Sequence, residues 1–246
     1  MNQGIYLSVI IPAYNEEDRI ARMLDVVWAY LKRQSYSSEI IAVSGNSTDN
    51  TVSVIKNKMD RISNLSVIDQ KDNKGKGDAV REGMLNARGE IRLFTDADNS
   101  TDISHFDKMR PLFDQGYEVV ICSRDSRDAF GAQQATSQTW YKRFLGQAGN
   151  LFIQLVVVRG IWDTQCGFKA FREFAAEKIF SQQKIPGWGF DIEVLALARA
   201  LGYKIGMVPA YWINDPKSHV RFSTYFQVLY ETIKIRLNFL SGKYEV

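Results

Sequence analysis

Two aspartates, Asp96 and Asp98, follow directly after the apolar run Ile91–Thr95. Such a run is typical of a strand buried on both faces of a parallel sheet, and carboxylates at i and i+2 lie on the same side of an extended backbone. Open α/β sheets bind ligands at the carboxyl ends of their strands, and hard carboxylate oxygens suit Mg²⁺ or Mn²⁺. The pair therefore predicts an enzyme that binds a divalent cation and a nucleotide diphosphate. A lone Asp-x-Asp is common, so this prediction depends on the rest of the chain.

The composition is that of an ordinary globular protein. The chain has 246 residues, 45% of them hydrophobic and 24% charged, and a net charge of +3. From Tyr203 onward six Lys/Arg face three Asp/Glu, so residues 1–202 are neutral. This balance disfavours nucleic-acid binding. The basic, aromatic-rich end fits either an anionic membrane surface or a solvated helix face.

Cysteine usage and hydropathy indicate a reducing, cytoplasmic setting. Cys122 and Cys166 lack metal-ligand spacing and are too few for a disulfide framework. The N-terminus has no signal-peptide pattern. The longest apolar stretch, residues 151–158, is interrupted by Gln154 and is far shorter than the ~20 residues of a membrane-spanning helix. We expect any membrane contact to be peripheral, on the cytoplasmic face.

Strands and helices alternate in the first half, which predicts an α/β fold with a mostly parallel sheet flanked by helices. Asn15 is the expected N-cap of the first helix. Strands are expected over 7–12, 39–43, 65–69, 91–95 and 117–122, and helices over 15–31, 47–59, 78–87 and 102–115.

The second half is predicted to be mainly helical, with helices over 139–158, 174–181, 190–201 and 222–240 and an edge strand over 204–209. The last helix is amphipathic. We expect its apolar stripe to pack onto the sheet. The alternatives are that the stripe lies in a membrane interface beside Arg221, Lys234 and Arg236, or that both hold, with a core-facing stripe and a lipid-facing rim. We expect one domain over 1–246, with a nucleotide-sugar half (1–125) and an acceptor half (126–246). The stripe comprises Phe222, Tyr225, Phe226, Leu229, Ile233, Leu237 and Leu240.

Two further strings fit nucleotide binding. Residues 8–17 read as a strand, a proline stop and a helix start, which would set Pro12 and Tyr14 against a base or ribose. Gly75, Lys76 and Gly77 stand at a loop-to-helix junction, where backbone N–H groups and the lysine could meet a phosphate. A flexible turn is the alternative for this second string.

Residues 8–17 resemble the opening of the family 2 glycosyltransferases, which are inverting nucleotide-sugar enzymes with a GT-A fold. Asp96-Ala97-Asp98 falls where that family carries its metal-binding motif. Strings at 73–84, 158–169, 189–193 and 235–242 resemble the dolichyl-phosphate β-glucosyltransferase branch, so the resemblance runs from residue 8 to about residue 243. Polyprenyl-phosphate glycosyltransferases and dolichol-phosphate mannose synthases share the first half but match residues 163–169 less closely.

The resemblance implies a UDP-sugar donor, most closely UDP-glucose, and Mg²⁺ or Mn²⁺ held by Asp98 and Asp96. One departure concerns the nucleobase: both aspartates of the family's Asp-Asp-Gly-Ser string are missing, at Ser44 and Gly45. Ser44 or Asn46 could still hydrogen-bond a uracil edge. The implied donor contacts are Pro12, Ala13, Tyr14, Glu16, Ser44, Asn46, Lys76, Gly77, Asp96 and Ala97.

The implied acceptor is a polyprenyl (dolichyl) phosphate, whose anionic oxygen needs no strong general base. Asp191 resembles an acceptor-side carboxylate, with a helix N-cap as the alternative, and Asp163 is expected to orient Lys169 or the acceptor. His105 is expected at the surface. Trp162, Trp188 and Trp212 are expected in the core, with the acceptor groove as the alternative. The implied catalytic residues are Asp98, Asp96, Arg124 and Asp191, and the implied acceptor contacts are Arg124, Arg143, Asp163, Gln165, Lys169, Lys217 and Arg221.

Two other functions stay open. A different family 2 enzyme would use another donor such as GDP-mannose, or a soluble sugar acceptor. A non-catalytic nucleotide-sugar binding module is compatible with the missing aspartates at Ser44 and Gly45; it would bind UDP without turnover.

Overall fold

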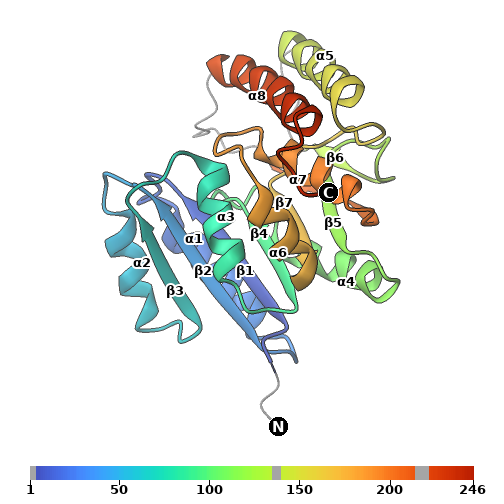
Figure 1. Ribbon diagram of the computed structural model, residues 1–246. Coiled ribbons are helices and arrows are strands. Elements are labelled where there is room, and N and C mark those ends of the chain that lie inside the picture. Colours follow the sequence, from blue (N-terminus) through green and yellow to red (C-terminus); the bar gives the residue numbers. More distant parts are fainter. Residues whose placement is uncertain (1–3, 135–139, 214–221) are drawn as a thin grey trace.

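The computed structural model describes residues 4–134, 140–213 and 222–246 and is built on a seven-stranded sheet (Figure 1). The strand order is β3-β2-β1-β4-β7-β5-β8, and a short separate pair joins β6 to β9. The strands are β1 Leu7–Ala13, β2 Ser38–Gly45, β3 Leu65–Gln70, β4 Ile91–Thr95, β5 Val119–Ser123, β6 Gln133–Gln134, β7 Phe168–Arg172, β8 Ile205–Pro209 and β9 Tyr211–Trp212.

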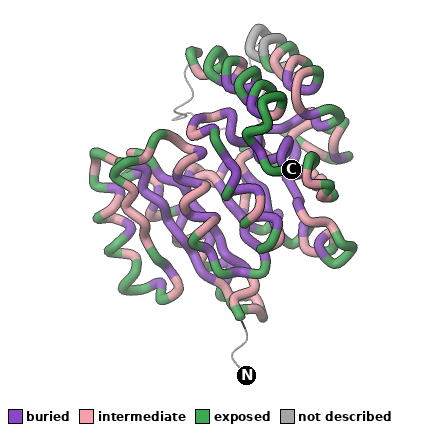
Figure 2. Tube along the Cα trace, viewed as in Figure 1, coloured by how far each residue is buried: buried purple, intermediate pink, exposed green. Residues whose placement is uncertain are grey.

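Helices cover both faces of the sheet and bury one apolar cluster on each (Figure 2). One face carries α1 Ile20–Leu31, α2 Thr51–Met59, the 3₁₀ turn η1 Ile103–His105 and α4 Phe106–Asp114. The other carries α3 Lys76–Asn86, α6 Glu173–Gln182 and α7 Phe190–Ala200. Two further helices, α5 Trp140–Val156 and α8 Phe222–Leu240, lie side by side beyond this face (Figure 1).

The predicted α/β fold with a mostly parallel sheet is confirmed, and β8 is an edge strand as expected. Strand β7 was not predicted. It runs antiparallel between β4 and β5, with Phe168 opposite Thr95 and Lys169 opposite Ile121. Because of this direction, β7 begins where β4 and β5 end, which brings the residues before it to the edge of the sheet formed by the ends of those strands.

The first helices begin later than the pattern predicts. Helix α1 starts at Ile20 rather than Asn15, because Asn15 adopts a φ of 53° and its Oδ1 accepts a hydrogen bond from Thr48 N at 2.8 Å. Helix α2 starts at Thr51, whose N–H donates to Asp49 Oδ1 at 2.9 Å. Both starts are therefore set by turns between strand and helix.

Helix α8 has the predicted bounds but presents the opposite face to the protein. Its apolar stripe is exposed: Phe226 is 63% exposed, Leu237 57% and Leu240 68%. The buried side is mixed, because Glu231 accepts a hydrogen bond from Gly189 N at 2.6 Å and Asn238 donates to Tyr244 Oη at 3.2 Å. The expected packing of the stripe onto the sheet is wrong, since these polar contacts fix the helix orientation.

Leu151 and Leu155 of the neighbouring α5 are exposed as well. Despite this apolar surface, none of the helices in the described ranges combines the length and the low charge that a membrane span would need.

His105 is buried, contrary to the expected surface position. Its Nδ1 lies 2.9 Å from Asp102 O, and its Nε2 accepts a hydrogen bond from Tyr211 N at 3.0 Å. This fixes the neutral ring with its proton on Nδ1, and burial lowers the pKa of His105. The imidazole thus joins η1 to β9.

Candidate active site

Strands β1, β2 and β4 end at one edge of the sheet, where the turns are strained. Asn15, Asn46 and Asn99 follow these three strands with φ values of 53°, 59° and 55°. They are the non-glycine residues with positive φ in the described part of the chain. Asparagine tolerates this conformation better than most residues, and such strain concentrates at functional sites. This edge is therefore the candidate site.

Asp96 and Asp98 lie at the centre of that edge. Asp96 N donates to Gly167 O at 3.2 Å, and a Cβ on Gly167 would collide with the Asp96 carboxylate. Only glycine leaves room here for the carboxylate. Asp98 Oδ1 accepts a hydrogen bond from Ser100 N at 2.8 Å. Burial and, after it, the charge of Asp96 raise the pKa of Asp98, so the pair holds excess negative charge that a cation would neutralise.

Lys76 is the cation already present beside this pair. Its Nζ lies 2.6 Å from Asp96 Oδ1 and 5.3 Å from the centre of the Trp188 ring. Burial would lower the pKa of Lys76, but the carboxylates of Asp96, Asp191 and Asp98 outweigh it and raise that pKa. Lys76 therefore stays charged at the N-terminus of α3, close to Asp96 and Asp98.

Asp191 and Lys169 form a second, fully buried ion pair next to the Lys76–Asp96 pair. Lys169 is 0% exposed and also donates from Nζ to Cys166 O at 2.7 Å. Burial raises the pKa of Asp191, and Lys169 and Lys76 offset part of this rise. No side chain caps α7, so the N-cap alternative for Asp191 is wrong. The expected acceptor contact of Lys169 is not supported either, because its ammonium is enclosed by protein.

Arg124 is clamped by Asp163 just after β5. Its Nε and Nη2 lie 2.8 and 2.7 Å from the two carboxylate oxygens, and its N–H donates to the same group at 2.8 Å. Asp163 thus orients Arg124, not Lys169 as one prediction had it. Burial alone would raise the pKa of Asp163, but the guanidinium outweighs it and holds that pKa below its usual range. The Arg124 side chain remains 24% exposed, so the protein does not enclose it completely.

Helix α8 supports the site through Glu231, which the sequence reasoning missed. Glu231 is buried, and its Oε2 accepts the hydrogen bond from Gly189 N at 2.6 Å. Gln227 Nε2 donates to Glu231 Oε1 at 2.9 Å. The carboxylate therefore fixes the loop that carries Trp188 against Lys76. The available signal in the sequence was that Glu231 is the one acidic residue in the segment 222–240 and lies outside its apolar stripe.

Two of the expected donor residues point into the protein. Ser44 is 0% exposed and its hydroxyl donates to Ser47 Oγ at 3.0 Å. The Glu16 carboxylate is buried and accepts from Arg19 Nη2 at 2.8 Å. Neither prediction of a nucleotide contact is supported, because both groups already bind protein. Of the other expected donor contacts, Pro12, Ala13 and Ala97 are buried near the strand ends, and Tyr14 and Asn46 are exposed there.

The glycines around Lys76 are tightly packed. Gly75 N donates to Asn73 Oδ1 at 2.9 Å and Asp78 N to Pro186 O at 3.1 Å. A Cβ on Gly77 would lie 2.6 Å from Phe190 Cβ. The flexible-turn alternative is therefore wrong. The amides of Gly75 and Asp78 are occupied, and the phosphate contact of Lys76 and Gly77 stays a prediction.

The tryptophans expected in the core are all half-buried beside cations. The Cζ atom of Arg127 lies 3.6 Å from the centre of the Trp162 ring, and that of Arg124 lies 5.4 Å from the centre of the Trp212 ring. Trp188 and Trp212 therefore belong to the walls of the site. Of the other acceptor residues, Gln165 is exposed, Arg143 lies on α5 but its side chain is outside the description, and Lys217 and Arg221 lie outside the described residues.

The residues at this edge suit a hard divalent cation. Within the described ranges, no group of three or more His, Cys, Asp or Glu side chains gathers as a metal site. Asp96 and Asp98 supply two carboxylates. Mg²⁺ is usually bound by one or two protein carboxylates, and substrate phosphates complete its coordination shell.

The chain matches the family described as Glycosyl transferase family 2 over residues 8–180. Dolichyl-phosphate beta-glucosyltransferases from Drosophila melanogaster and Homo sapiens are 34% and 30% identical to it; the alignments cover 99% and 98% of this chain and 78% of each relative.

Solved structures with the same fold include glucosyl-3-phosphoglycerate synthase from Mycobacterium tuberculosis in complex with Mn²⁺, UDP-glucose and phosphoglyceric acid. It aligns with a TM-score of 0.68 and 19% identity over 95% of this chain and 79% of its own. Mannosyl-3-phosphoglycerate synthase from Rubrobacter xylanophilus aligns with a TM-score of 0.62 and 16% identity over 98% of this chain and 76% of its own. Together with the clustered carboxylates at the end of β4, these similarities lead to one conclusion: the chain belongs to glycosyl transferase family 2 and is a glycosyltransferase with a GT-A fold.

Proposed function

We propose that this enzyme transfers glucose from UDP-glucose to a polyprenyl (dolichyl) phosphate with inversion at the sugar carbon. The observation that carries the proposal is that relatives named dolichyl-phosphate beta-glucosyltransferase align with 94–99% of the chain. The alignment includes the second half, which supplies Asp163, Lys169 and Asp191 to the site. The acceptor-side residues therefore lie within the aligned region.

Asp96 and Asp98 would hold Mg²⁺ or Mn²⁺ in this reaction. The cation, when bound, neutralises negative charge on the departing diphosphate. Mn²⁺ and UDP in the glucosyl-3-phosphoglycerate synthase complexes support this assignment. Lys76 adds a fixed positive charge 2.6 Å from Asp96.

Arg124 would hold the acceptor phosphate. The attacking phosphate oxygen is already an anion, so no strong base must remove a proton. The obstacle is repulsion between two phosphate groups, and a charged guanidinium lowers it by charge-assisted hydrogen bonding. Asp163 holds Arg124 in one orientation, while the Lys169–Asp191 pair supports the floor of the site.

We also infer that residues 1–246 form one domain. Strands β7 and β8 of the second half belong to the sheet begun by the first half. The donor half (1–125) and the acceptor half (126–246) thus share one core.

A lipid acceptor requires access to a membrane, and we propose that the exposed stripe of α8 supplies it at the cytoplasmic face. Ile233 and Leu237 are 47% and 57% exposed, and Lys234 and Arg236 stand next to them in the sequence. Apolar side chains flanked by cations are typical of a helix that lies in the interface of an anionic membrane.

Replacing Leu237 by aspartate is expected to lower sedimentation with anionic vesicles about tenfold, because an apolar anchor is lost and a negative charge is added. Ile233→Asp should act likewise. Met59→Asp on α2, where Met59 is 38% exposed, is the matched control and should have no effect. Equal binding by all three variants and the wild type would contradict the membrane assignment.

The substrates are tested by transfer of labelled sugar from UDP-glucose, UDP-galactose and GDP-mannose to a short polyprenyl phosphate, with Mg²⁺ or Mn²⁺. We expect turnover with UDP-glucose, abolished by EDTA. Turnover with GDP-mannose alone would replace the donor and keep the acceptor. UDP binding without a lipid product would favour a non-catalytic binding module, the function suggested by the missing aspartates at Ser44 and Gly45.

A further inference from the structure

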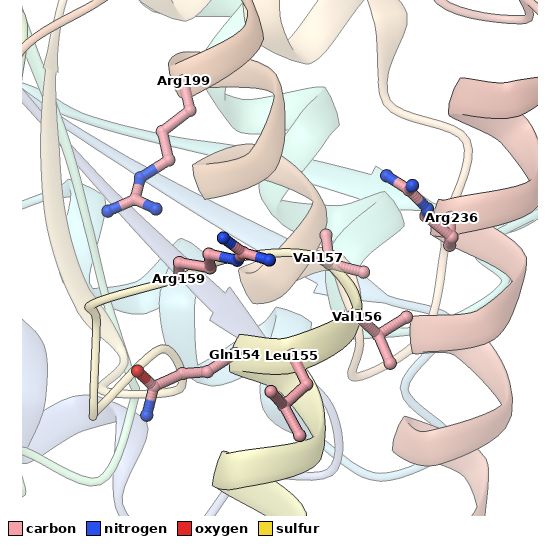
Figure 3. Close-up of a pocket in the computed structure, with 7 residues that line it drawn as sticks. All are labelled: Gln154, Leu155, Val156, Val157, Arg159, Arg199 and Arg236. Atoms are coloured by element: carbon pink, nitrogen blue, oxygen red, sulfur yellow. The ribbon is translucent and has the colours of Figure 1, made fainter.

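A cavity of about 340 Å³ opens between α5, α7 and α8 (Figure 3). Three arginines reach it from three elements: Arg159 from the turn after α5, Arg199 from the last turn of α7, and Arg236 from α8. Its remaining lining residues are Gln154, Leu155, Val156 and Val157. None of the lining residues is acidic, so the cavity is positively charged.

In the described part of the chain, the charges of these three arginines have no counterion. Among residues that the structure describes, none forms an ion pair with Arg159, Arg199 or Arg236. Burial lowers the pKa of Arg199, and no carboxylate acts against it. A Cβ on Gly160 would lie 4.0 Å from Arg199 Nη2, so the Arg199 guanidinium lies beside the turn that carries Arg159. Like charges held together repel unless an anion separates them.

Gln154 adds an unused donor to the wall. The residue is 8% exposed, and its Oε1 accepts a hydrogen bond from Gly160 N at 3.0 Å. Its Nε2 is buried without a hydrogen-bond partner in the described structure. Buried polar groups are nearly always hydrogen-bonded in native proteins, so this amide is a donor available to a ligand.

We propose that this cavity is a binding site for a phosphate group, separate from the catalytic centre. A planar guanidinium can donate two parallel hydrogen bonds to two oxygens of one phosphate. Three guanidinium groups with no carboxylate among the lining residues favour an anion that carries more than one negative charge. Asp191 and Arg199 lie at opposite ends of α7, about 12 Å apart along the helix axis. The cavity lining also shares no residue with the cluster around Asp96 and Asp98, so the phosphate it would bind is a second one.

The phosphate has two chemically equivalent sources: the headgroup of an anionic lipid, or a phosphate ester in solution. Leu155 is 68% exposed at the rim, beside the exposed stripe of α8. This apolar rim suits a phosphate carried by a lipid chain, and the experiment separates the two sources. The inference does not depend on the proposed sugar or acceptor.

The test compares the wild-type chain with the triple variant Arg159→Gln, Arg199→Gln and Arg236→Gln, in EDTA so that no metal recruits phosphate to the catalytic aspartates. One arm titrates glycerol 3-phosphate by calorimetry. The other sediments the protein with phosphatidylcholine vesicles, with and without phosphatidic acid. A control with the same charge change carries Arg22→Gln on α1, Arg33→Gln in the turn after α1 and Lys56→Gln on α2.

A site of this kind predicts that the triple variant loses about tenfold or more in one arm, while the control changes by less than about twofold. Loss only with phosphatidic acid vesicles identifies a lipid headgroup; loss with glycerol 3-phosphate identifies a soluble ester. Replacing the same arginines by lysines should also weaken binding, because the charge stays but the paired geometry is lost. Equal losses in the variant and the control, or no loss in either arm, would overturn the inference.

Discussion

Asp98→Ala is expected to lower the rate of sugar transfer about a thousandfold or more, because the leaving diphosphate loses its metal-based charge neutralisation. The fold should hold: Asp98 makes one backbone hydrogen bond, to Ser100 N at 2.8 Å, and is disfavoured as an anion by burial and by Asp96. We expect the free energy of unfolding to change by about 1 kcal/mol or less. Steady-state kinetics with saturating UDP-glucose and Mn²⁺, together with urea unfolding, measure both quantities.

Asp102→Ala is the matched control for this change. Asp102 Oδ1 accepts a hydrogen bond from Ser104 N at 2.9 Å, so it makes the same type of turn contact four residues further along. It should cost similar stability and little activity. Asp98→Asn, which keeps the turn contact and removes the charge, should be nearly as inactive as Asp98→Ala. Activity of Asp98→Asn within about threefold of the wild type would contradict a metal-binding role.

Lys169→Met is expected to destabilise the protein by about 3–5 kcal/mol, since removing one partner leaves Asp191 buried without its main counterion. Lys169 is 0% exposed and Asp191 is 2% exposed, so water cannot solvate the remaining charge. The double variant Lys169→Met with Asp191→Leu should regain much of this loss, because an apolar pair of similar volume avoids the buried charge. Urea unfolding of the two single variants and the double variant measures the coupling.

The double variant also separates positioning from stability. If the Lys169–Asp191 pair positions the residues of the active site, the folded double variant should bind UDP yet show a lower kcat. Lys178→Met on α6, whose side chain is 43% exposed, is the control and should cost less than about 0.5 kcal/mol. A cost below about 1 kcal/mol for Lys169→Met, or no recovery in the double variant, would contradict the prediction that the loss comes from leaving Asp191 buried and unpaired.

The regular elements were predictable where one local pattern decided them. The run Ile91–Thr95 is fully buried and carries three large apolar residues, and it is strand β4 with the predicted bounds. Strand β7 was missed because it contains Lys169, a residue that a central strand excludes unless its charge is paired. That partner, Asp191, is 22 residues away on another element, and no local pattern reveals it.

Helix α8 illustrates the same limit. Its bounds follow from periodicity, but its orientation depends on Glu231 and Asn238 reaching Gly189 and Tyr244. A periodic pattern assigns apolar residues to the core by default and cannot register such distant polar contacts.

The positions of the main site residues could be predicted from the sequence, but the residues they interact with could not. The positions of Asp96, Asp98, Lys76 and Arg124 near strand ends followed from motifs and the family resemblance. Their partners did not: Asp163 binds Arg124, and Ser44 turns inward to Ser47. The arginine cavity is invisible in the sequence, because its cations are separated by 40 and 37 positions.

The most direct test of the account is to identify the product formed from UDP-glucose and a short polyprenyl phosphate. Mass spectrometry of the lipid fraction should give one added hexose on the intact phosphate. Proton NMR should give a β-linked sugar, since the donor carries an α-linked one and the reaction inverts. Release of free glucose with an unmodified lipid, or an α-linked product, would contradict direct transfer to the acceptor phosphate.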